Sequence, residues 1–438
     1  MSDPTALLRQ RRFLPFFLTQ FLGAFNDNLY KNALVVLITF EAARYTALSS
    51  GVLVNLAAGL FILPFFLFSA TAGQLADKFD KGTLMRRIKA LEIGIMALAA
   101  VAFALDSLGW MLVTLFLMGA QSALFGPAKY AILPQHLAAD ELVGGNALVE
   151  AGTFVAILVG TIAGGVAMAL PGGPRWVAVA TLAVALAGYL ASRRIPPAPP
   201  PDASLRINFN PFTEIAATLR VVRAEPAVWR AVLAISWFWF YGALFLSQFP
   251  AYAKDVLGGD AHAVTLLLTV FSIGVGAGSM LCERLSRGRI ELALVVLGGV
   301  GMSVFALDLW WAGTAAGARG SARAIGAVLA EGATWRALFD LLMIGVSGGV
   351  FIVPLYTQMQ RRSAAVCRAR VIAGNNILNA LFMVVAAGMG AGLLAAGASV
   401  GELFLATALL NAGVVVTLTV AEPACTARLR AWLSRGKA

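Results

Sequence analysis

Four ionisable residues interrupt long apolar stretches of this sequence. Asp27 and Lys31 lie in one stretch, and Lys129 and Glu150 lie in two others. A carboxylate can bind an ammonium group or exchange a proton, and a lysine can bind a phosphate. Two acidic and two basic groups carry no net charge together, which suits a zwitterionic ligand. A charge in an apolar membrane-like environment costs at least about 2.5 kcal/mol, so each of the four requires an explanation.

These charges also have structural explanations, which the sequence leaves open. Asp27 and Lys31 are four residues apart, so they can form an ion pair on one helix. Lys129 lies near the end of its stretch, where its side chain can reach lipid headgroups. Glu150 can equally pair with Lys129. Asn28 extends the polar side of the helix around Asp27, and this surplus polarity favours a ligand path over a simple ion pair.

Two further groups of residues favour structural roles. Gly160 and Gly164 have the spacing that is typical of closely packed helices. The acidic residues Glu92, Asp308 and Asp340 are expected near helix ends, at the membrane surface. We therefore leave both groups outside the predicted site.

Twelve apolar runs must position the charged residues. The 438 residues are 60% hydrophobic and 13% charged, against roughly a quarter charged in a soluble protein. A helix needs about 20 apolar residues to cross a bilayer. The runs lack strand-like alternation, so we predict an all-α membrane protein with twelve transmembrane helices. Their predicted centres are Asp27, Ile62, Ala97, Phe116, Leu158, Val184, Phe240, Ile273, Val300, Gly345, Val385 and Ala408.

The net charge of +11 does not require a nucleic-acid partner. With both termini in the cytoplasm, most Lys and Arg residues fall in cytoplasmic loops, as the positive-inside rule describes. We therefore expect a multi-pass membrane protein that binds membrane lipids and no nucleic acid.

No cofactor, metal site or enzymatic centre is expected. The three cysteines, Cys282, Cys367 and Cys425, are odd in number and fall toward the cytoplasmic side, where thiols stay reduced. The two histidines, His136 and His262, have no nearby nucleophile or metal partners. The sequence contains no glycine-rich phosphate-binding motif.

The longest polar interruption divides the chain into two halves. It starts with Arg193 and Arg194, continues through a proline-rich stretch and contains an amphipathic segment over 212–222. Such a segment cannot span a membrane, so we predict a cytoplasmic linker over 193–226. It would separate two six-helix bundles, 1–192 and 227–438.

Short patterns recur at equivalent helices of the two halves, which predicts pseudo-symmetric bundles. Gly145 and Asn146 precede Glu150 in the fifth helix, and Gly374 and Asn375 precede Asn379 in the eleventh. The same alignment places Tyr356 opposite Lys129. One wall of the site would then be ionic and the other would carry amides and aromatic rings. We predict that the following residues bind the ligand: Asp27, Asn28, Lys31, Gln121, Lys129, Glu150, Tyr356 and Asn379.

The loop after the second helix resembles a family motif. Gly73, Leu75, Asp77, Lys78 and Lys81 match the pattern G-x-L-x-D-[RK]-x-x-[RK] of the major facilitator superfamily, although Asp80 stands where that family usually has glycine. The resemblance implies a loop that holds the cytoplasmic ends of the two halves together. The gating residues it implies, with their counterparts after the eighth helix, are Asp77, Lys78, Lys81, Glu283 and Arg284.

Three further segments narrow the resemblance. GAFNDNLYKN at 23–32, FGPAKYAILPQ at 125–135 and NALVEA at 146–151 are similar to the lysophospholipid transporters, and even more so to the transporter half of transporter–acyltransferase fusions. No acyltransferase region is expected within these 438 residues.

The resemblance implies a function. A lysophospholipid such as lysophosphatidylethanolamine would move from the outer to the inner leaflet of a bacterial inner membrane by alternating access. A cytoplasmic lysophospholipid acyltransferase would be a partner. The alternative is a proton-coupled exporter of drugs or small solutes, with Asp27 or Glu150 as the proton site.

Overall fold

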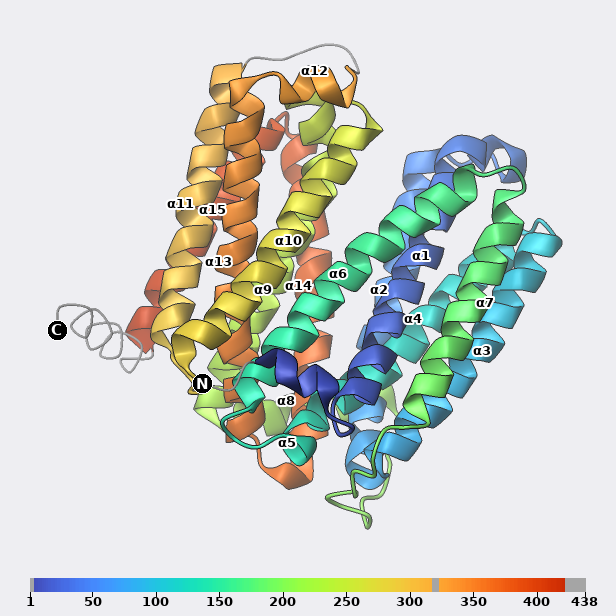
Figure 1. Cartoon of the computed structure of the whole chain (residues 1–438), viewed down its shortest axis with the longest axis vertical. Helices are drawn as coiled ribbons and strands as arrows, with labels where there is room; N and C mark the ends of the chain where they lie inside the picture. Colours follow the sequence, from blue (N-terminus) through green and yellow to red (C-terminus); the bar gives the residue numbers. More distant parts are fainter. Residues whose placement is uncertain (1–3, 317–322, 422–438) are drawn as a thin grey trace.

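The computed structural model describes residues 4–316 and 323–421, and of these the side chains of 314–316 are not described. Long helices form two bundles that lie side by side (Figure 1). The bundles meet at the end of the molecule that carries α5 and α8 and separate toward the other end. We refer to these as the closed end and the open end.

Each predicted centre falls inside one of twelve long helices of the described chain, which confirms the all-α prediction. The first bundle contains η1 (Pro4–Arg9), α1 (Leu14–Tyr45), α2 (Ser50–Lys78), α3 (Lys81–Ala104), α4 (Leu108–Ala131), the short α5 (Leu133–His136), α6 (Leu142–Ala169) and α7 (Gly173–Ser192). The second contains α9 (Pro226–Ala251), η2 (Tyr252–Val256), α10 (Ala261–Ser286), α11 (Ala293–Ala316), α12 (Ile325–Leu329), α13 (Gly332–Arg362), η3 (Ala365–Cys367), α14 (Arg368–Ala395) and α15 (Val400–Ala421).

Two of the twelve helices are unusually polar. Ten helices of the described residues are long and apolar enough to cross a membrane, and α1 and α3 are not among them. The middle of α1 contains Asn26, Asp27 and Lys31, and α3 contains Lys89 and Glu92. These two helices are as long as the others, so their polar groups must find partners inside the protein.

Glycines allow α6 to lie directly against α1, as the sequence predicts. A Cβ atom at Gly160 would lie 2.4 Å from the carbonyl oxygen of Phe25, and one at Gly164 would lie 2.2 Å from that of Leu29. Any larger residue would push the two helices apart.

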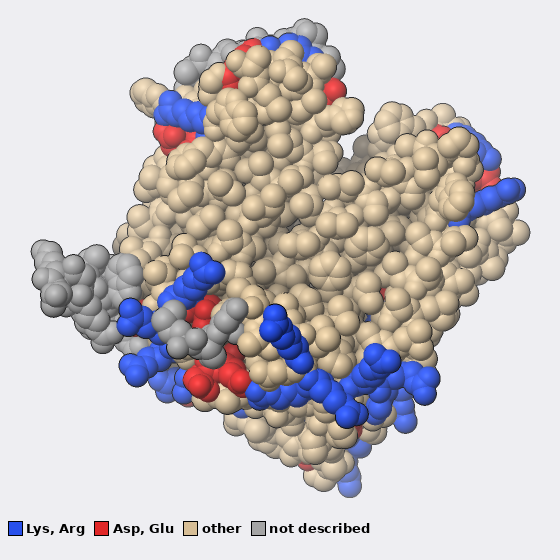
Figure 2. All heavy atoms as spheres, in the orientation of Figure 1, with Lys and Arg blue, Asp and Glu red and all other residues tan. Residues whose placement is uncertain are grey.

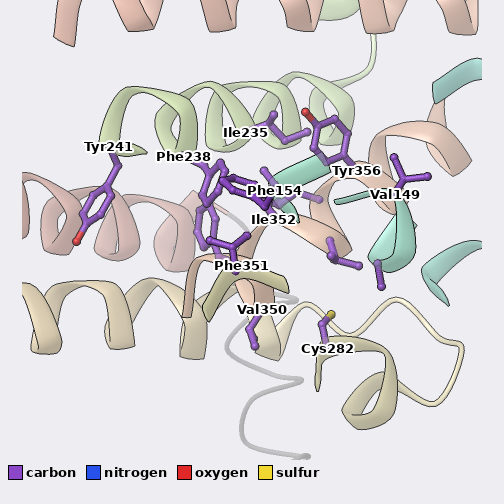
Figure 3. Close-up of a cluster of buried hydrophobic side chains, with 14 of the residues drawn as sticks. Val149, Phe154, Ile235, Phe238, Tyr241, Cys282, Val350, Phe351, Ile352 and Tyr356 are labelled. Atoms are coloured by element: carbon purple, nitrogen blue, oxygen red, sulfur yellow. The ribbon is translucent and has the colours of Figure 1, made fainter. Parts of the chain in front are cut away.

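Contacts between the bundles involve α2 with α14 and α6 with α10. The largest group of buried apolar side chains contains described residues of both bundles, whereas the three smaller groups each belong to one bundle. Figure 3 shows part of the shared group, where Phe154 of α6 lies among Phe238 of α9 and Phe351 of α13. The two bundles therefore share one core toward the closed end.

The segment between the bundles contains α8 (Pro211–Arg223). Asn210 caps this helix by accepting hydrogen bonds from the backbone NH groups of Phe212 and Thr213. The helix packs against α14, where a Cβ atom at Gly374 would lie 2.5 Å from Val222. We propose that the chain is divided as the sequence predicts, into 1–192, a linker over 193–226 and 227–438.

Of the cysteines, Cys282 and Cys367 are free thiols, and Cys425 lies outside the described residues.

Candidate functional site

Asp27 and Lys31 lie near the middle of α1, and both side chains are partly exposed. The carboxylate of Asp27 accepts a hydrogen bond of 2.5 Å from the hydroxyl of Ser122 on α4. The ammonium group of Lys31 lies 5.3 Å from the ring centre of Phe61 on α2, at cation–π distance. No ion pair within 4 Å joins Asp27 to Lys31 in the described part of the chain. Neither charge is therefore neutralised by the other in this state.

Asp27 is connected to a second pair of charges inside the first bundle. The side-chain amide of Gln121 donates to Glu92 at 3.1 Å, and its oxygen lies 3.2 Å from the hydroxyl of Ser122. Lys89 forms an ion pair with Glu92, and both side chains are almost fully buried. Asn26 donates a further hydrogen bond of 2.9 Å to Glu92.

The prediction that Glu92 lies near a helix end was wrong. Since α3 begins at Lys81, Glu92 lies about 16 Å along the helix, and buried partners rather than water stabilise its charge. Asp340 is also buried instead of interfacial, whereas Asp308 is exposed and pairs with Arg336.

The hydroxyl of Ser122 lies between two acceptors. It faces the oxygen of Gln121 and a carboxylate oxygen of Asp27, yet it has one proton to donate. A proton on Asp27 would complete the chain, because Asp27 would then donate to Ser122 and Ser122 to Gln121. The contacts of Ser122 are therefore compatible with a protonated Asp27.

Lys129 lies at the closed-end half of α4. Its ammonium group donates to the hydroxyl of Thr153 on α6 at 3.0 Å and lies 5.0 Å from the ring centre of Tyr130. It forms no ion pair with Glu150 among the described residues. Thr153 in turn lies 3.1 Å from the side-chain oxygen of Gln20 on α1. Lys129 therefore joins α4 to α6 rather than extending to the lipid headgroups.

Glu150 and Tyr356 meet at an aromatic contact between the bundles. Glu150 accepts a hydrogen bond of 2.6 Å from the hydroxyl of Tyr130. The ring of Tyr130 stacks on that of Tyr356, with ring centres 4.5 Å apart and an interplanar angle of 5°. Trp239 of α9 donates to the hydroxyl of Tyr356 at 3.4 Å. This contact joins the two bundles on the closed-end side of Lys129.

Amide side chains form a second contact between the bundles. Asn146 at the start of α6 donates to the side-chain oxygen of Gln360 at 2.7 Å, and Gln360 donates back at 3.0 Å. Gln360 also donates to the backbone oxygen of Tyr130 at 3.2 Å. All of these groups are buried. Such reciprocal bonds fix the relative position of the two bundles in this state.

Three of the predicted ligand-binding residues point elsewhere. Asn28 donates to the carbonyl oxygen of Ala24 on its own helix and lies in the contact of α1 with α6. Gln121 is directed at Glu92, inside the first bundle. Asn379 accepts from Ser236, so it links α14 to α9 within the second bundle.

Of the predicted gating residues, Asp77 joins the two bundles. Its buried carboxylate accepts from the backbone NH groups of Ala369 and Arg370, at 3.1 Å and 3.3 Å, and from the side chain of Arg370 at 3.1 Å. The carboxylate thus lies at the positive end of the α14 dipole. Asp77 at the end of α2 therefore holds the start of α14.

The other predicted gating residues have different neighbours. The side chain of Lys78 donates to the carbonyl oxygen of Leu205 in the linker. The backbone NH of Lys81 donates to the carbonyl oxygen of Ala198 in the same segment. Glu283 lies beside the start of α6, where a Cβ atom at Gly144 would be 3.4 Å from its Cγ. This is the pseudo-symmetric counterpart of Asp77 beside α14. Arg284 is exposed.

Sequence reasoning missed the partners Arg370 and Gln360 and the buried Lys89. The sequence could have predicted this ion pair, because Lys89 and Glu92 are three residues apart, a spacing at which helical side chains meet. Nothing in a single sequence indicates which residue of a distant helix faces Asp77 or Asn146.

Comparisons with known proteins agree with this architecture. The lysophospholipid transporter LplT of Serratia proteamaculans is 29% identical over 387 residues, which cover 84% of this chain and 84% of that protein. The protein of the same name from an Enterobacter species is 28% identical over 368 residues, 82% of this chain and 81% of the other.

Solved structures share the fold at lower identity. The human organic anion transporter MFSD10 superposes with a TM-score of 0.74 at 14% identity, covering 92% of this chain and 99% of that one. The transporter FucP in its outward conformation gives a TM-score of 0.68 at 14% identity, covering 94% of this chain and 99% of that one. The sequence profile of the Major Facilitator Superfamily matches residues 16–387. The chain, a multi-pass membrane transporter, therefore belongs to the Major Facilitator Superfamily.

Proposed function

We propose that this transporter moves lysophospholipids, such as lysophosphatidylethanolamine, from the outer to the inner leaflet of a bacterial inner membrane by alternating access. The observation that carries the proposal is the state of Asp27 and Lys31. Both are partly exposed, of opposite charge and not paired with each other. An ammonium group near Asp27 and a phosphate near Lys31 or Lys129 would satisfy both charges.

An aromatic cluster shared by the two bundles supplies an apolar counterpart to this ionic wall. Phe154 of α6 lies 6.4 Å from the rings of Phe238 and Phe271 and 6.5 Å from that of Trp239. Trp239 is partly exposed, and the three phenylalanines are buried in the shared core and would face a ligand when the bundles separate. A lysophospholipid needs polar groups for its headgroup and apolar surface for its single chain. The combination of an ionic wall and an aromatic wall favours such an amphiphile over a sugar or an inorganic ion.

The arrangement of the bundles suits alternating access. Hydrogen bonds between the described residues of the two bundles involve the ends of α2, α4 and α13 and the starts of α6 and α14, all at the closed end. At the open end Figure 2 shows a hollow between the bundles. We propose that α1 presents Asp27 and Lys31 to this hollow, where Ser122 of α4 and Phe61 of α2 contact them.

The closed end is proposed to face the cytoplasm, with both termini on that side. Figure 2 shows Lys and Arg side chains gathered at this end, as the positive-inside rule requires for a cytoplasmic face. The relatives named lysophospholipid transporter cover most of the chain and support the substrate class. A cytoplasmic acyltransferase that consumes the delivered lysophospholipid is a proposed partner.

The direct test is inward movement of labelled lysophosphatidylethanolamine in vesicles that contain only this protein. We expect protein-dependent movement that saturates with substrate, and equal movement in vesicles with and without protein would overturn the proposal. Glycerophosphoethanolamine, which has the headgroup and no acyl chain, serves as the control compound. It should not compete effectively with labelled lysophosphatidylethanolamine.

The second candidate is a proton-coupled exporter, which the position of Ser122 between two acceptors favours. Such an exporter would need a pH gradient to drive its solute. An uncoupler separates the two candidates, because it would abolish export but leave lysophospholipid movement down its own gradient intact.

A further inference from the structure

A cavity of about 490 Å³ lies at the closed end of the second bundle, away from the proposed transport path. It is formed by the loop between α10 and α11 and by the end of α13. Three arginines line it, together with a buried amide and two apolar side chains: Arg289, Arg361, Arg362, Gln358, Ile290 and Leu292. Three cations around one concave surface make a site that attracts an anion.

Acidic residues do not neutralise these arginines within the described chain. Arg289, Arg361 and Arg362 are exposed, and none of them takes part in an ion pair there. Glu291, the acidic residue of the same loop, does not line the cavity. The three positive charges are therefore held close together without a counter-charge from the described residues.

The side chain of Gln358 adds a neutral polar group to the cavity. The residue is only 8% exposed, and its amide atoms are not among the fully buried polar atoms of the described residues that lack a partner. The amide is therefore accessible to a polar group in the cavity and can both donate and accept. Gln358 lines this cavity and also the crevice next to it, so a polar group entering from the cavity can reach the amide.

The neighbouring crevice is narrow and largely apolar, with a volume of about 30 Å³. It shares Leu292 and Gln358 with the cavity and continues between α9, α11, α13 and α15. Its further lining is apolar except for Arg230 of α9: Arg230, Ala231, Val295, Val296, Leu355, Val415 and Leu418. A cationic cavity beside a largely apolar crevice favours a molecule with an anionic head and a hydrocarbon chain over a free inorganic anion. The crevice has room for only the first part of such a chain.

The first bundle covers the equivalent place with its own chain. There the linker runs across the start of α3 and the short α5 that follows α4. The NH of Ala198 donates to Asp80 at 2.6 Å, and the ring of His136 lies 3.3 Å from the oxygen of Pro197. In the second bundle no segment of the described residues takes this position. The sequence 422–438, which follows α15, contains four basic residues and one acidic residue, so its charge does not complement the arginines.

We propose that this cavity, named here the arginine cavity, binds the headgroup of an anionic phospholipid such as phosphatidylglycerol from the surrounding leaflet. The phosphate would lie among Arg289, Arg361 and Arg362, and part of an acyl chain would lie along the crevice. Basic pockets between the cytoplasmic ends of transmembrane helices recognise anionic headgroups in this way. The bound lipid would stabilise the contact of α13 with α11, independently of the substrate that the transporter carries.

The test measures thermal unfolding of the full chain in neutral detergent during titration with phosphatidylglycerol. Ligand binding to the folded state raises the unfolding temperature with a half-saturating concentration. We expect a saturable rise for the unaltered protein and no comparable rise with phosphatidylcholine. The variant Arg289→Gln/Arg361→Gln/Arg362→Gln should raise the half-saturating concentration by about tenfold or more.

The matched control is Arg9→Gln/Arg193→Gln/Arg194→Gln, which removes the same charge from exposed sites at the same end of the molecule. It should respond to phosphatidylglycerol like the unaltered protein. If both triple variants lose the response equally, binding is non-specific and the proposal is wrong. An equal rise with inorganic phosphate or glycerophosphoglycerol would assign the cavity to a free anion and would also overturn it.

If the triple variant does not fold, the double variant Arg361→Gln/Gln358→Leu takes its place. It should also raise the half-saturating concentration of phosphatidylglycerol. Movement of lysophosphatidylethanolamine in vesicles of neutral lipid does not depend on this site. Failure of lipid binding and failure of transport are therefore separate results.

Discussion

Tyr130 and Tyr356 stack face to face across the two bundles, with ring centres 4.5 Å apart. The hydroxyl of Tyr130 bonds to Glu150, so a charge predicted to bind ligand supports an inter-bundle contact in this state. The same residues can serve both purposes, because opening the closed end would separate the two rings and expose Tyr130 and Glu150, which both belong to the first bundle.

Replacing Tyr356 by alanine should weaken the closed end. Stacked rings contribute about 0.5 to 1.5 kcal/mol beyond burial, so the population open at this end should rise by up to about tenfold. The measurement is the rate of disulfide formation between cysteines placed on α6 and α10, which should fall. Tyr356→Phe keeps the ring and should leave the rate close to that of the parent. A rate unchanged by Tyr356→Ala would contradict the role of the stack.

That cysteine pair gives a prediction of its own. A Cβ atom at Gly276 would lie 3.8 Å from the Cβ atom of Ala151, a separation typical of disulfides. In a background without the native cysteines, Ala151→Cys/Gly276→Cys should cross-link readily and block transport, and a reductant should restore it. Each single cysteine variant serves as the control. Full transport by the cross-linked protein would exclude movement of one bundle against the other.

Asp77→Asn should lower the population of the state in which the two bundles meet at the closed end, without unfolding the protein. The carboxylate receives three hydrogen bonds from the start of α14, and bonds to a charged group are worth about 1.5 to 3 kcal/mol each. Disulfide formation between α6 and α10 should therefore slow. Asp80→Asn is the matched control, because the partners of the Asp80 carboxylate among the described residues are Thr83 and Ala198, which lie outside the second bundle. We expect it to lower thermal stability and to leave the cross-linking rate unchanged; the reverse outcome would contradict this assignment.

The buried pair of Lys89 and Glu92 should control stability. Removing one partner leaves an uncompensated buried charge, which costs about 3 to 5 kcal/mol. Lys89→Met should therefore lower the thermal unfolding temperature strongly, and Lys89→Met/Glu92→Gln should recover most of the loss. Asp308→Asn, at an exposed pair with Arg336, should cost less than about 1 kcal/mol. Equal losses from Lys89→Met and Asp308→Asn would show that the pair is not buried in the membrane-bound protein.

The sequence predicts the fold better than it predicts contacts between helices. Hydrophobic runs locate all twelve long helices, because spanning the bilayer requires length and low polarity. The sequence also indicated a close contact of α6 with another helix, because Gly160 and Gly164 lie on one helix face. A helical wheel gives the face of a residue but not its neighbour, which explains why Gln121 was placed in a ligand site although it bonds to Glu92.

Partners from the other bundle were not predictable for a related reason. The repeat alignment places Tyr356 opposite Lys129, whereas the structure stacks it on the next residue, Tyr130. The contact of Asp77 with Arg370 depends on how far α2 and α14 are displaced along each other, and residue spacing within one chain does not determine that displacement. The wrong prediction for Glu92 has a different cause. Basic residues precede it in the sequence, and a group of charges is typical of a helix end at the membrane surface.

The most direct test of the proposed transport is the flux of labelled lysophosphatidylethanolamine in vesicles that contain Asp27→Asn. Loss of the carboxylate that would bind the ammonium group should reduce flux by about tenfold or more while thermal unfolding stays close to that of the parent. Asp140→Asn, at an exposed loop position, should transport like the parent. A folded Asp27→Asn variant with full flux would contradict the proposed role of the charge on α1.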